Sequence, residues 1–254
     1  MKRTLWVLAC ILISAGNGLA QQTFYFPQIA DGLDPAPQTT HWHTTIFLSN
    51  QGTSLVSGTV TFFSSAGTTM NISFVDDRGL AAAVGNQITF QIAAGQTRKY
   101  TSVASGSLKV GYGIVNSNGQ LAGNAMFAHW TNPPAETLIA EAGVPSAALL
   151  AKQAVFADTQ NGYFTGVAIA NPGATALVVN LDLLNTDGVS VATRTLTLGP
   201  GEHIARYHHE LFTNVPAMAG RIQFSSSAGL LTAVGLRFDP ALSKFTTLFP
   251  FTVP

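Results

Sequence analysis

Two histidines, His41 and His43, are the residues of this chain best suited by type and spacing to begin a metal site. They flank Trp42 in a segment where apolar and polar residues alternate, as they do in a β-strand. Residues two apart on a strand project from the same face, so we expect both imidazoles to point the same way. Imidazole nitrogen binds zinc and other transition metals, but a third ligand is needed and the sequence does not identify one. The alternative is a pair of surface histidines at the start of a strand.

Other patterns that could support catalysis are incomplete. His208, His209 and Glu210 are adjacent, so they lack the i, i+4 histidine pair of zinc hydrolases and predict a polar turn. No serine lies in a Gly-x-Ser-x-Gly elbow, and Ser105-Gly106-Ser107 lies in an expected turn. We therefore expect no catalytic residue and no cofactor, and a protein that is not an enzyme.

Two acidic pairs could supply oxygen ligands to a calcium ion: Asp31 with Asp34, and Asp76 with Asp77. Neither pair belongs to a segment with the regular acidic spacing of a calcium-binding loop. Both pairs therefore also fit an ordinary role in loops.

Aromatic side chains suggest a different kind of site, a platform on which sugar rings stack. The candidates are Tyr25, Trp42, Tyr112, Trp130 and Tyr163. We select Trp130, which lies in the Pro-rich segment 129–134, together with Tyr112, as candidate ligand-binding residues. Because most aromatic side chains of a β-sandwich belong to its core, packing is the alternative for each of them.

The segments that must position these residues occur twice along the chain. Residues 42–67 resemble residues 163–188 at a constant offset of 121. Trp42 corresponds to Tyr163, Asn50-Gln51-Gly52 to Asn171-Pro172-Gly173, and Ser65-Ala66-Gly67 to Thr186-Asp187-Gly188. Such self-similarity indicates two copies of one module. At the two histidine positions, however, the second copy has Gly162 and Phe164.

Period-two alternation in segments 43–49, 58–62 and 193–198, with turn residues recurring about every ten positions, predicts short antiparallel strands. We predict an all-β chain of two tandem immunoglobulin-like β-sandwich domains produced by duplication, residues 21–146 and 147–254. A changed offset later in the repeat puts about fifteen extra residues of the first copy near residues 68–87. One-turn helices are expected only at residues 145–152 and 208–212.

The first twenty residues have the layout of a secretory signal peptide. Lys2 and Arg3 precede a short apolar run, and Gly18-Leu19-Ala20 offers small residues for cleavage after Ala20. A membrane anchor is the alternative, but the run is far shorter than the ~20 residues needed to span a bilayer. Lipid attachment at Cys10 is a further alternative. The expected location is secreted, cell-surface or periplasmic.

Cleavage would remove the only cysteine, so the mature chain would contain no disulfide and no thiol nucleophile. Of twelve basic residues, Lys2 and Arg3 would be lost, leaving ten against twelve acidic residues and a net charge of −2. No basic surface is expected that would attract nucleic acid. Charged residues are 9% of the chain, so Thr, Ser, Asn and Gln must cover most of its surface.

Several strings of the chain resemble a recurrent type of exported bacterial protein. They are Phe26-Pro27-Gln28-Ile29-Ala30-Asp31-Gly32, Thr44-Thr45-Ile46-Phe47-Leu48-Ser49-Asn50, Glu141-Ala142-Gly143-Val144-Pro145, Thr165-Gly166-Val167-Ala168-Ile169-Ala170-Asn171-Pro172, Gly235-Leu236-Arg237-Phe238, and Phe245-Thr246-Thr247-Leu248. The resemblance covers essentially the whole mature chain and implies tandem immunoglobulin-like sandwiches and export. It implies no catalytic residues, because its motifs are structural.

The function predicted from these observations is a secreted, non-catalytic two-module protein with an extracellular interaction or structural role. Its partner would be an extracellular protein or a glycan, and its oligomeric state is left open. A carbohydrate-binding accessory module is the first alternative. A metal-dependent hydrolase using His41 and His43 is the second.

Overall fold

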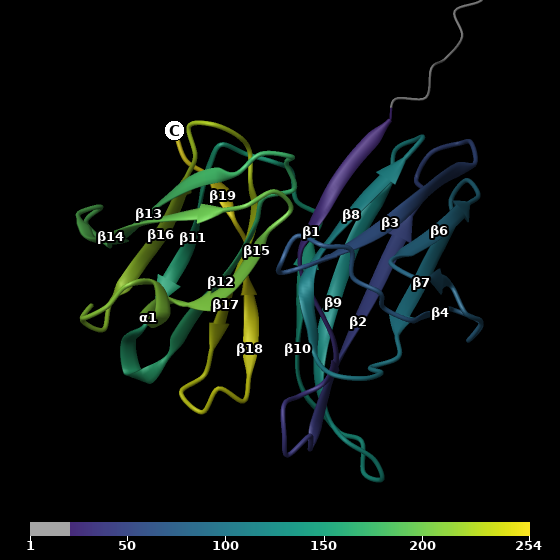
Figure 1. Cartoon of the computed structure of the whole chain (residues 1–254), viewed down its shortest axis with the longest axis horizontal. Helices are drawn as coiled ribbons and strands as arrows, with labels where there is room; N and C mark the ends of the chain where they lie inside the picture. The colour runs from purple at the N-terminus through teal and green to yellow at the C-terminus, as the bar shows by residue number, and fades with distance from the viewer. Residues whose placement is uncertain (1–20) are drawn as a thin grey trace, which may run out of the picture.

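The computed structural model describes residues 21–254, and the expected signal segment with Cys10 and Ala20 lies outside the described residues. Residues 21–254 are all-β, with antiparallel sheets in a sandwich-like arrangement. Figure 1 shows two bodies of strands side by side, residues 21–146 and residues 147–254, which we name the first half and the second half. No helix in the described part of the chain has the length and apolar character needed to cross a membrane.

The strands of the first half are β1 (Gln22–Leu33), β2 (Thr40–Ser49), β3 (Val56–Ser64), β4 (Phe74–Asp76), β5 (Ala83–Val84), β6 (Gln87–Ile92), β7 (Thr97–Ser102), β8 (Lys109–Ser117), β9 (Ala122–Thr131) and β10 (Leu138–Pro145). The elements of the second half are β11 (Lys152–Asp158), the 3₁₀ turn η1 (Gln160–Gly162), β12 (Phe164–Ala170), β13 (Leu177–Asn185), β14 (Ser190–Leu198), β15 (His203–Tyr207), α1 (His208–Leu211), β16 (Ala219–Ser225), β17 (Thr232–Phe238), β18 (Phe245–Leu248) and β19 (Phe251–Thr252).

Alternating burial explains why these segments become strands. In β6, Ile88, Phe90 and Ile92 are buried while Thr89 and Gln91 between them are exposed. A strand sends successive side chains to opposite faces, so this pattern buries one face and leaves the other in water. One apolar core includes Phe26, Phe62 and Phe74 of the first half together with Phe245 of the second, and the other includes Leu181, Ile222 and Phe224 of the second half.

Strand pairing gives the two halves the same core arrangement. In the first half, the orders β1-β8-β3-β6 and β10-β9-β2-β7 are hydrogen-bonded, and the end of β1 crosses over to pair with β2. In the second half, the orders are β11-β16-β13-β14 and β18-β17-β12-β15. Eight strands of each half thus have counterparts at the same places in the other half, whereas β4, β5 and β19 have none.

The extra residues predicted near 68–87 of the first half form strands as well as loops. β4 pairs with β7 and β5 pairs with β6, so the segment adds one short strand to the edge of each sheet. Met70, Ile72 and Phe74 of this segment are buried. The segment therefore extends the core of the first half and covers two sheet edges that would otherwise be open.

Of the two predicted helical turns, one is present. α1 (His208–Leu211) is a single helical turn, as expected, with Phe212 at its C-terminal cap. The helical turn predicted at residues 145–152 is wrong. Ala147 there pairs with Tyr25 and Leu150 pairs with Leu231, so backbone bonds to both halves keep the connection extended.

The two halves meet along β10 and β18, which lie side by side in Figure 1. Thr247 Oγ1 donates a hydrogen bond across this boundary to the carbonyl oxygen of Gly143. A second contact joins two turns: Ala66 forms a β-bridge with Glu202, and the backbone N–H of His203 donates to the carbonyl oxygen of Ser65. Backbone bonds thus fix the two halves relative to one another.

Gly67 allows the close approach of these turns. It has φ +77°, and a Cβ at this position would lie 2.5 Å from the carbonyl oxygen of Pro200. Gly188, its counterpart in the repeat, has φ +78° and no atom within 4 Å of a Cβ. We expect Gly67→Ala to lower the free energy of unfolding by about 2 kcal/mol more than Gly188→Ala, since only the former adds a steric clash to the backbone strain that both incur. Urea unfolding of the two variants measures the difference, and equal losses would contradict the contact.

Candidate functional site

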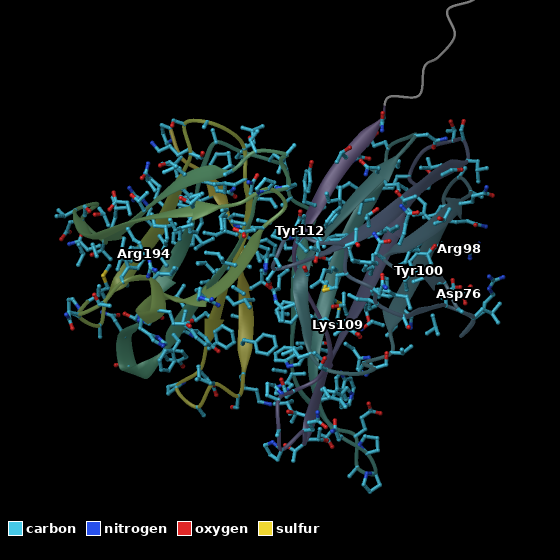
Figure 2. All side chains as sticks on the ribbon, viewed as in Figure 1. Asp76, Arg98, Tyr100, Lys109, Tyr112 and Arg194 are labelled. Atoms are coloured by element: carbon cyan, nitrogen blue, oxygen red, sulfur yellow. The ribbon has the colours of Figure 1, made fainter. Side chains whose placement is uncertain are left out.

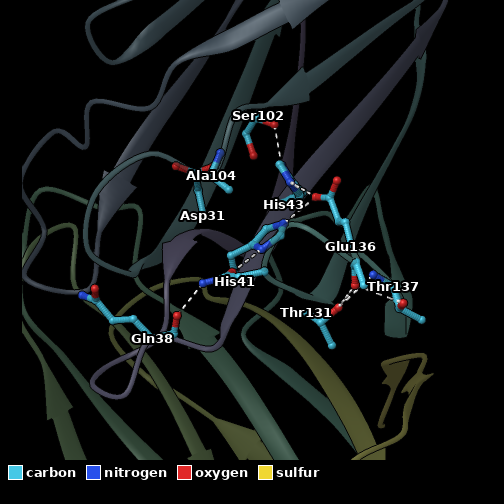
Figure 3. A network of polar contacts seen from close by, with 11 residues as sticks. Asp31, Gln38, His41, His43, Ser102, Ala104, Thr131, Glu136 and Thr137 are labelled. Atoms are coloured by element: carbon cyan, nitrogen blue, oxygen red, sulfur yellow. Dashed lines mark hydrogen bonds and ion pairs between the residues drawn. The ribbon is translucent and has the colours of Figure 1, made fainter.

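His41 and His43 project from the same face of β2, as their spacing predicts, and a third ligand group lies beside them. The Nε2 atom of His41 is 2.9 Å from Oε1 of Glu136, and that of His43 is 3.9 Å from the same oxygen. Figure 3 shows the two rings and the carboxylate converging. Among the described residues, these three form the one group of His, Cys, Asp or Glu side chains whose ligand atoms are close enough to hold a metal ion.

The second nitrogen of each imidazole has its own partner. His43 Nδ1 lies 2.7 Å from the carbonyl oxygen of Ser102, which can only accept a hydrogen bond. His41 Nδ1 lies 2.7 Å from Oδ1 of Asn132, whose amide group donates in turn to the carbonyl oxygen of Gln38. These partners place a proton on Nδ1 of both rings and leave Nε2 facing Glu136.

Glu136 lies in the tight loop between β9 and β10, and Thr131 fixes the shape of that loop. The Thr131 hydroxyl donates to the carbonyl oxygen of Ala135 and accepts from the backbone N–H of Thr137. The backbone N–H of Thr131 also donates to the carbonyl oxygen of Thr137. The segment that carries the carboxylate is therefore ordered before any ligand arrives.

The protein covers the cluster on the side of His41, whereas the side of Glu136 is open to solvent. The side chain of His41 is 5% exposed and that of His43 is 23% exposed, whereas that of Glu136 is 47% exposed.

Asp31 is fully buried, and its Oδ1 accepts from the backbone N–H of Ala104 while its Oδ2 has no partner (Figure 3). Burial raises the pKa of Asp31, because a buried carboxylate favours its neutral form.

Neither of the predicted acidic pairs converges on a common point. Asp31 points to Ala104, whereas Asp34 accepts hydrogen bonds from Thr40, Trp42 and His129. The other pair lies far from the second half, at the edge of the first half where Figure 2 labels Asp76 and Arg98. Asp76 caps its own turn through the backbone N–H groups of Arg78 and Leu80, and Asp77 pairs with Arg98 at 3.5 Å. Each carboxylate therefore has its own protein partners, which lie within the same turn for Asp76 and on other segments of the chain for the other three.

Neither of the two candidate ligand-binding residues, Tyr112 and Trp130, lies in an exposed loop. Tyr112 is only 1% exposed and lies where the two halves meet (Figure 2), with its ring stacked on Phe63 and near His203. Burial raises the pKa of Tyr112 to about 12. A ring so buried cannot offer a face to a sugar, so Tyr112 is withdrawn as a ligand-binding residue. Trp130 is half-buried and belongs to β9, opposite His41, rather than to the following loop.

A pocket of about 310 Å³ lies between the two halves. We name it the junction pocket. Its apolar wall comes from Leu108, Trp42 and Phe127 of the first half and from Leu236, Phe238 and Phe245 of the second. The indole of Trp42 is stacked on His129 at 4.3 Å and packs near Phe245 at 5.7 Å between ring centroids. Exposed Arg206 and Glu210 also line the pocket, which brings it to the surface.

Asp34 is the polar centre of the first-half wall of the junction pocket. Its carboxylate accepts the indole N–H of Trp42 at 2.8 Å and lies 2.8 Å from Nε2 of His129. Partial burial alone would raise the pKa of Asp34, but the hydrogen bonds from Thr40, Trp42 and His129 together lower it. The carboxylate thus stays ionised and holds the indole and imidazole rings in place.

Glu136 and the junction pocket are the features that the sequence analysis missed. Glu136 is the carboxylate nearest in sequence to the Pro-rich segment 129–134, but only the antiparallel pairing of β2 with β9 brings its loop to the histidines. The junction pocket combines residues more than a hundred positions apart, such as Trp42 and Phe245. No local sequence pattern predicts that residues so far apart in the chain line the same pocket.

No protein-family model and no curated protein matches this chain.

Proposed function

We propose that this chain is an exported, non-catalytic protein of two tandem immunoglobulin-like β-sandwich modules that binds an extracellular ligand in the junction pocket. The duplication is supported by the matching strand orders of the two halves. It is supported further by Asn50 and Asn171, the repeat-related asparagines, which make equivalent hydrogen bonds in the two halves. Export is supported by the charged start, apolar run and small residues of positions 1–20.

The observation that carries this proposal is a pocket bounded by both modules while the modules are held in a fixed relation. Small-molecule sites are concave, mostly apolar and commonly found at domain boundaries, with volumes of roughly 300 to 1,000 Å³. The junction pocket, at about 310 Å³, falls at the small end of that range. Its aromatic wall, with Trp42 from the first half and Phe238 from the second, suits a ligand that has a flat apolar face.

Fluorescence of Trp42 can report binding directly. Trp42 and Trp130 are the only tryptophans beyond residue 20, so Trp130→Phe leaves Trp42 as the single indole of the mature chain. Titration of this variant with 1-anilinonaphthalene-8-sulfonate, an apolar aromatic probe, is expected to quench the Trp42 emission to saturation. We expect Ala205→Phe, which adds a ring to a residue lining the junction pocket, to weaken binding of the probe at least tenfold.

Val178→Phe is the matched control, because Val178 is exposed on β13 and does not line the junction pocket. It introduces the same phenyl ring away from the junction pocket and should leave probe binding unchanged. Binding that is equally tight in the Ala205→Phe variant would contradict the proposed site. Oligosaccharides that displace the probe would assign the ligand to carbohydrates, whereas displacement only by apolar compounds would exclude that alternative.

A further inference from the structure

We propose that Nε2 of His41, Nε2 of His43 and the carboxylate of Glu136 form a binding site for a divalent transition-metal ion such as Zn²⁺. The ligand atoms of the three residues lie within 4.8 Å of one another. Bonds of about 2.0 Å in tetrahedral geometry put ligand atoms roughly 3.3 Å apart. The observed separations of 2.9 Å and 3.9 Å from Glu136 Oε1 lie on either side of that value, so small side-chain rotations suffice.

The hydrogen bonds of the two Nδ1 atoms prepare the rings for a metal. Histidines that bind metals almost always donate the other ring N–H to a carbonyl or carboxylate, which fixes the tautomer and the orientation of the ring. His43 has this partner in the carbonyl oxygen of Ser102, and His41 has it in Oδ1 of Asn132. In both neutral rings, the Nε2 lone pair is therefore directed at the position that the ion would occupy.

The position of the cluster in the fold argues against a purely structural role. The corresponding residues of the second half are Gly162 and Phe164, yet that half forms the same strand arrangement without any histidine there. Glu136, at 47% exposure, leaves one side of the cluster open to water. A fourth coordination position on that side would be filled by water or by a ligand from solvent.

The donor set selects the class of metal. Two imidazole nitrogens and one carboxylate oxygen suit Zn²⁺, Cu²⁺ or Ni²⁺, whereas Ca²⁺ and Mg²⁺ require mostly oxygen ligands. The site lies on the open face of β2, and it is separate from the junction pocket, whose lining includes none of His41, His43 and Glu136. The inference therefore goes beyond the proposed function and can fail or hold independently of it.

Isothermal titration of the purified protein with ZnCl₂ tests the inference. We expect one ion per chain, and at least a hundredfold weaker binding in the His43→Gln variant. We expect at least tenfold weaker binding in Glu136→Gln. Both residues are partly exposed, so these variants should fold, and far-UV circular dichroism verifies this. The control is His209→Gln, which removes an exposed histidine of α1 and should leave the affinity unchanged.

Electron paramagnetic resonance of the Cu²⁺-loaded protein identifies the ligands. We expect hyperfine coupling to two imidazole nitrogens in the wild type and to one in His43→Gln, a change that a merely structural histidine would not produce. MgCl₂ and CaCl₂ should give no stoichiometric binding. The inference is overturned if the wild type binds no Zn²⁺, or if His43→Gln and Glu136→Gln bind it as tightly as the wild type.

Discussion

Asn171→Ala is expected to lower the free energy of unfolding by about 4 kcal/mol, the largest loss that we predict for a single polar side chain. Asn171 is fully buried at the end of β12. The two hydrogens of its amide nitrogen are shared among the carbonyl oxygens of Thr175, Leu198 and Gly199, and its Oδ1 accepts from the backbone N–H of Gly173. Alanine would leave these backbone groups without the partner that compensates their burial. Urea unfolding followed by far-UV circular dichroism measures the loss.

Asn50 provides the matching test in the first half. It is also fully buried, donates to the carbonyl oxygens of Ser54 and Ile92, and accepts from the backbone N–H of Gly52. Because the variant would leave one fewer backbone carbonyl group without a partner, Asn50→Ala should cost about 3 kcal/mol. The control is Asn180→Ala, since Asn180 is exposed on β13 and should change stability by less than about 0.5 kcal/mol. Losses as small as that of the control would show that the two buried amides do not secure these loops.

These asparagines also show which features of the molecule follow from its sequence. Asn50-Gln51-Gly52 and Asn171-Pro172-Gly173 are repeat-related, and both halves use the asparagine to join a loop to the end of a strand. Alternation of apolar and polar residues predicts strands such as β6 and β13, because one buried face requires a period of two. Features that depend on local pattern and on repetition can therefore be predicted from the amino-acid sequence.

Features that depend on the meeting of distant segments cannot be predicted in this way. In the segment 68–87, polar and apolar residues alternate over residues 69–74, yet the strands form at β4 (Phe74–Asp76) and β5 (Ala83–Val84). Open sheet edges beside these residues accept their backbone hydrogen bonds, which the local pattern does not predict. The connection at 145–152 has small residues typical of a helical turn, but pairing of Ala147 with Tyr25 overrides that propensity. Tertiary hydrogen bonds determine the conformation of both segments.

Only the two histidines of the candidate metal site can be predicted from the sequence, because Glu136 joins them through tertiary structure. Spacing on one strand places His41 and His43 on a common face, which is a local property. Glu136 joins them through the register of β2 with β9, in which His41 lies opposite Trp130 six residues before the carboxylate. A loop shape set by Thr131 then turns Glu136 back toward the rings. The first step follows from sequence, whereas the other two depend on tertiary structure.

Acid is expected to destabilise the protein through His203, which is fully enclosed where the two halves meet. Nε2 of His203 lies 3.1 Å from Oε1 of Gln28, and Nδ1 lies 3.1 Å from Oγ of Ser65, both in the other half. Burial lowers the pKa of His203 from 6.5 to about 4. The native state therefore favours the neutral ring, whereas the unfolded chain takes up a proton below pH 6.5. Its contribution is complete above pH 6.5 and is lost as the pH falls toward 4.

At about 1.4 kcal/mol per pKa unit, this loss amounts to about 3 kcal/mol between pH 6.5 and pH 4. The pKa of His208 is also lowered by burial, so the wild-type slope contains a further contribution of the same sign. The difference between His203→Gln and the wild type isolates His203, because glutamine does not titrate. In urea unfolding measured from pH 4.5 to 7.5, we expect the stability of the variant to lack the pH dependence that uptake of one proton by His203 produces. The control Asn180→Ala, which changes an exposed side chain that does not titrate, should keep the wild-type slope. Equal slopes in His203→Gln and the wild type would mean that the boundary between the halves admits water to this ring, and the junction pocket beside it would then lack the rigid walls that ligand binding requires.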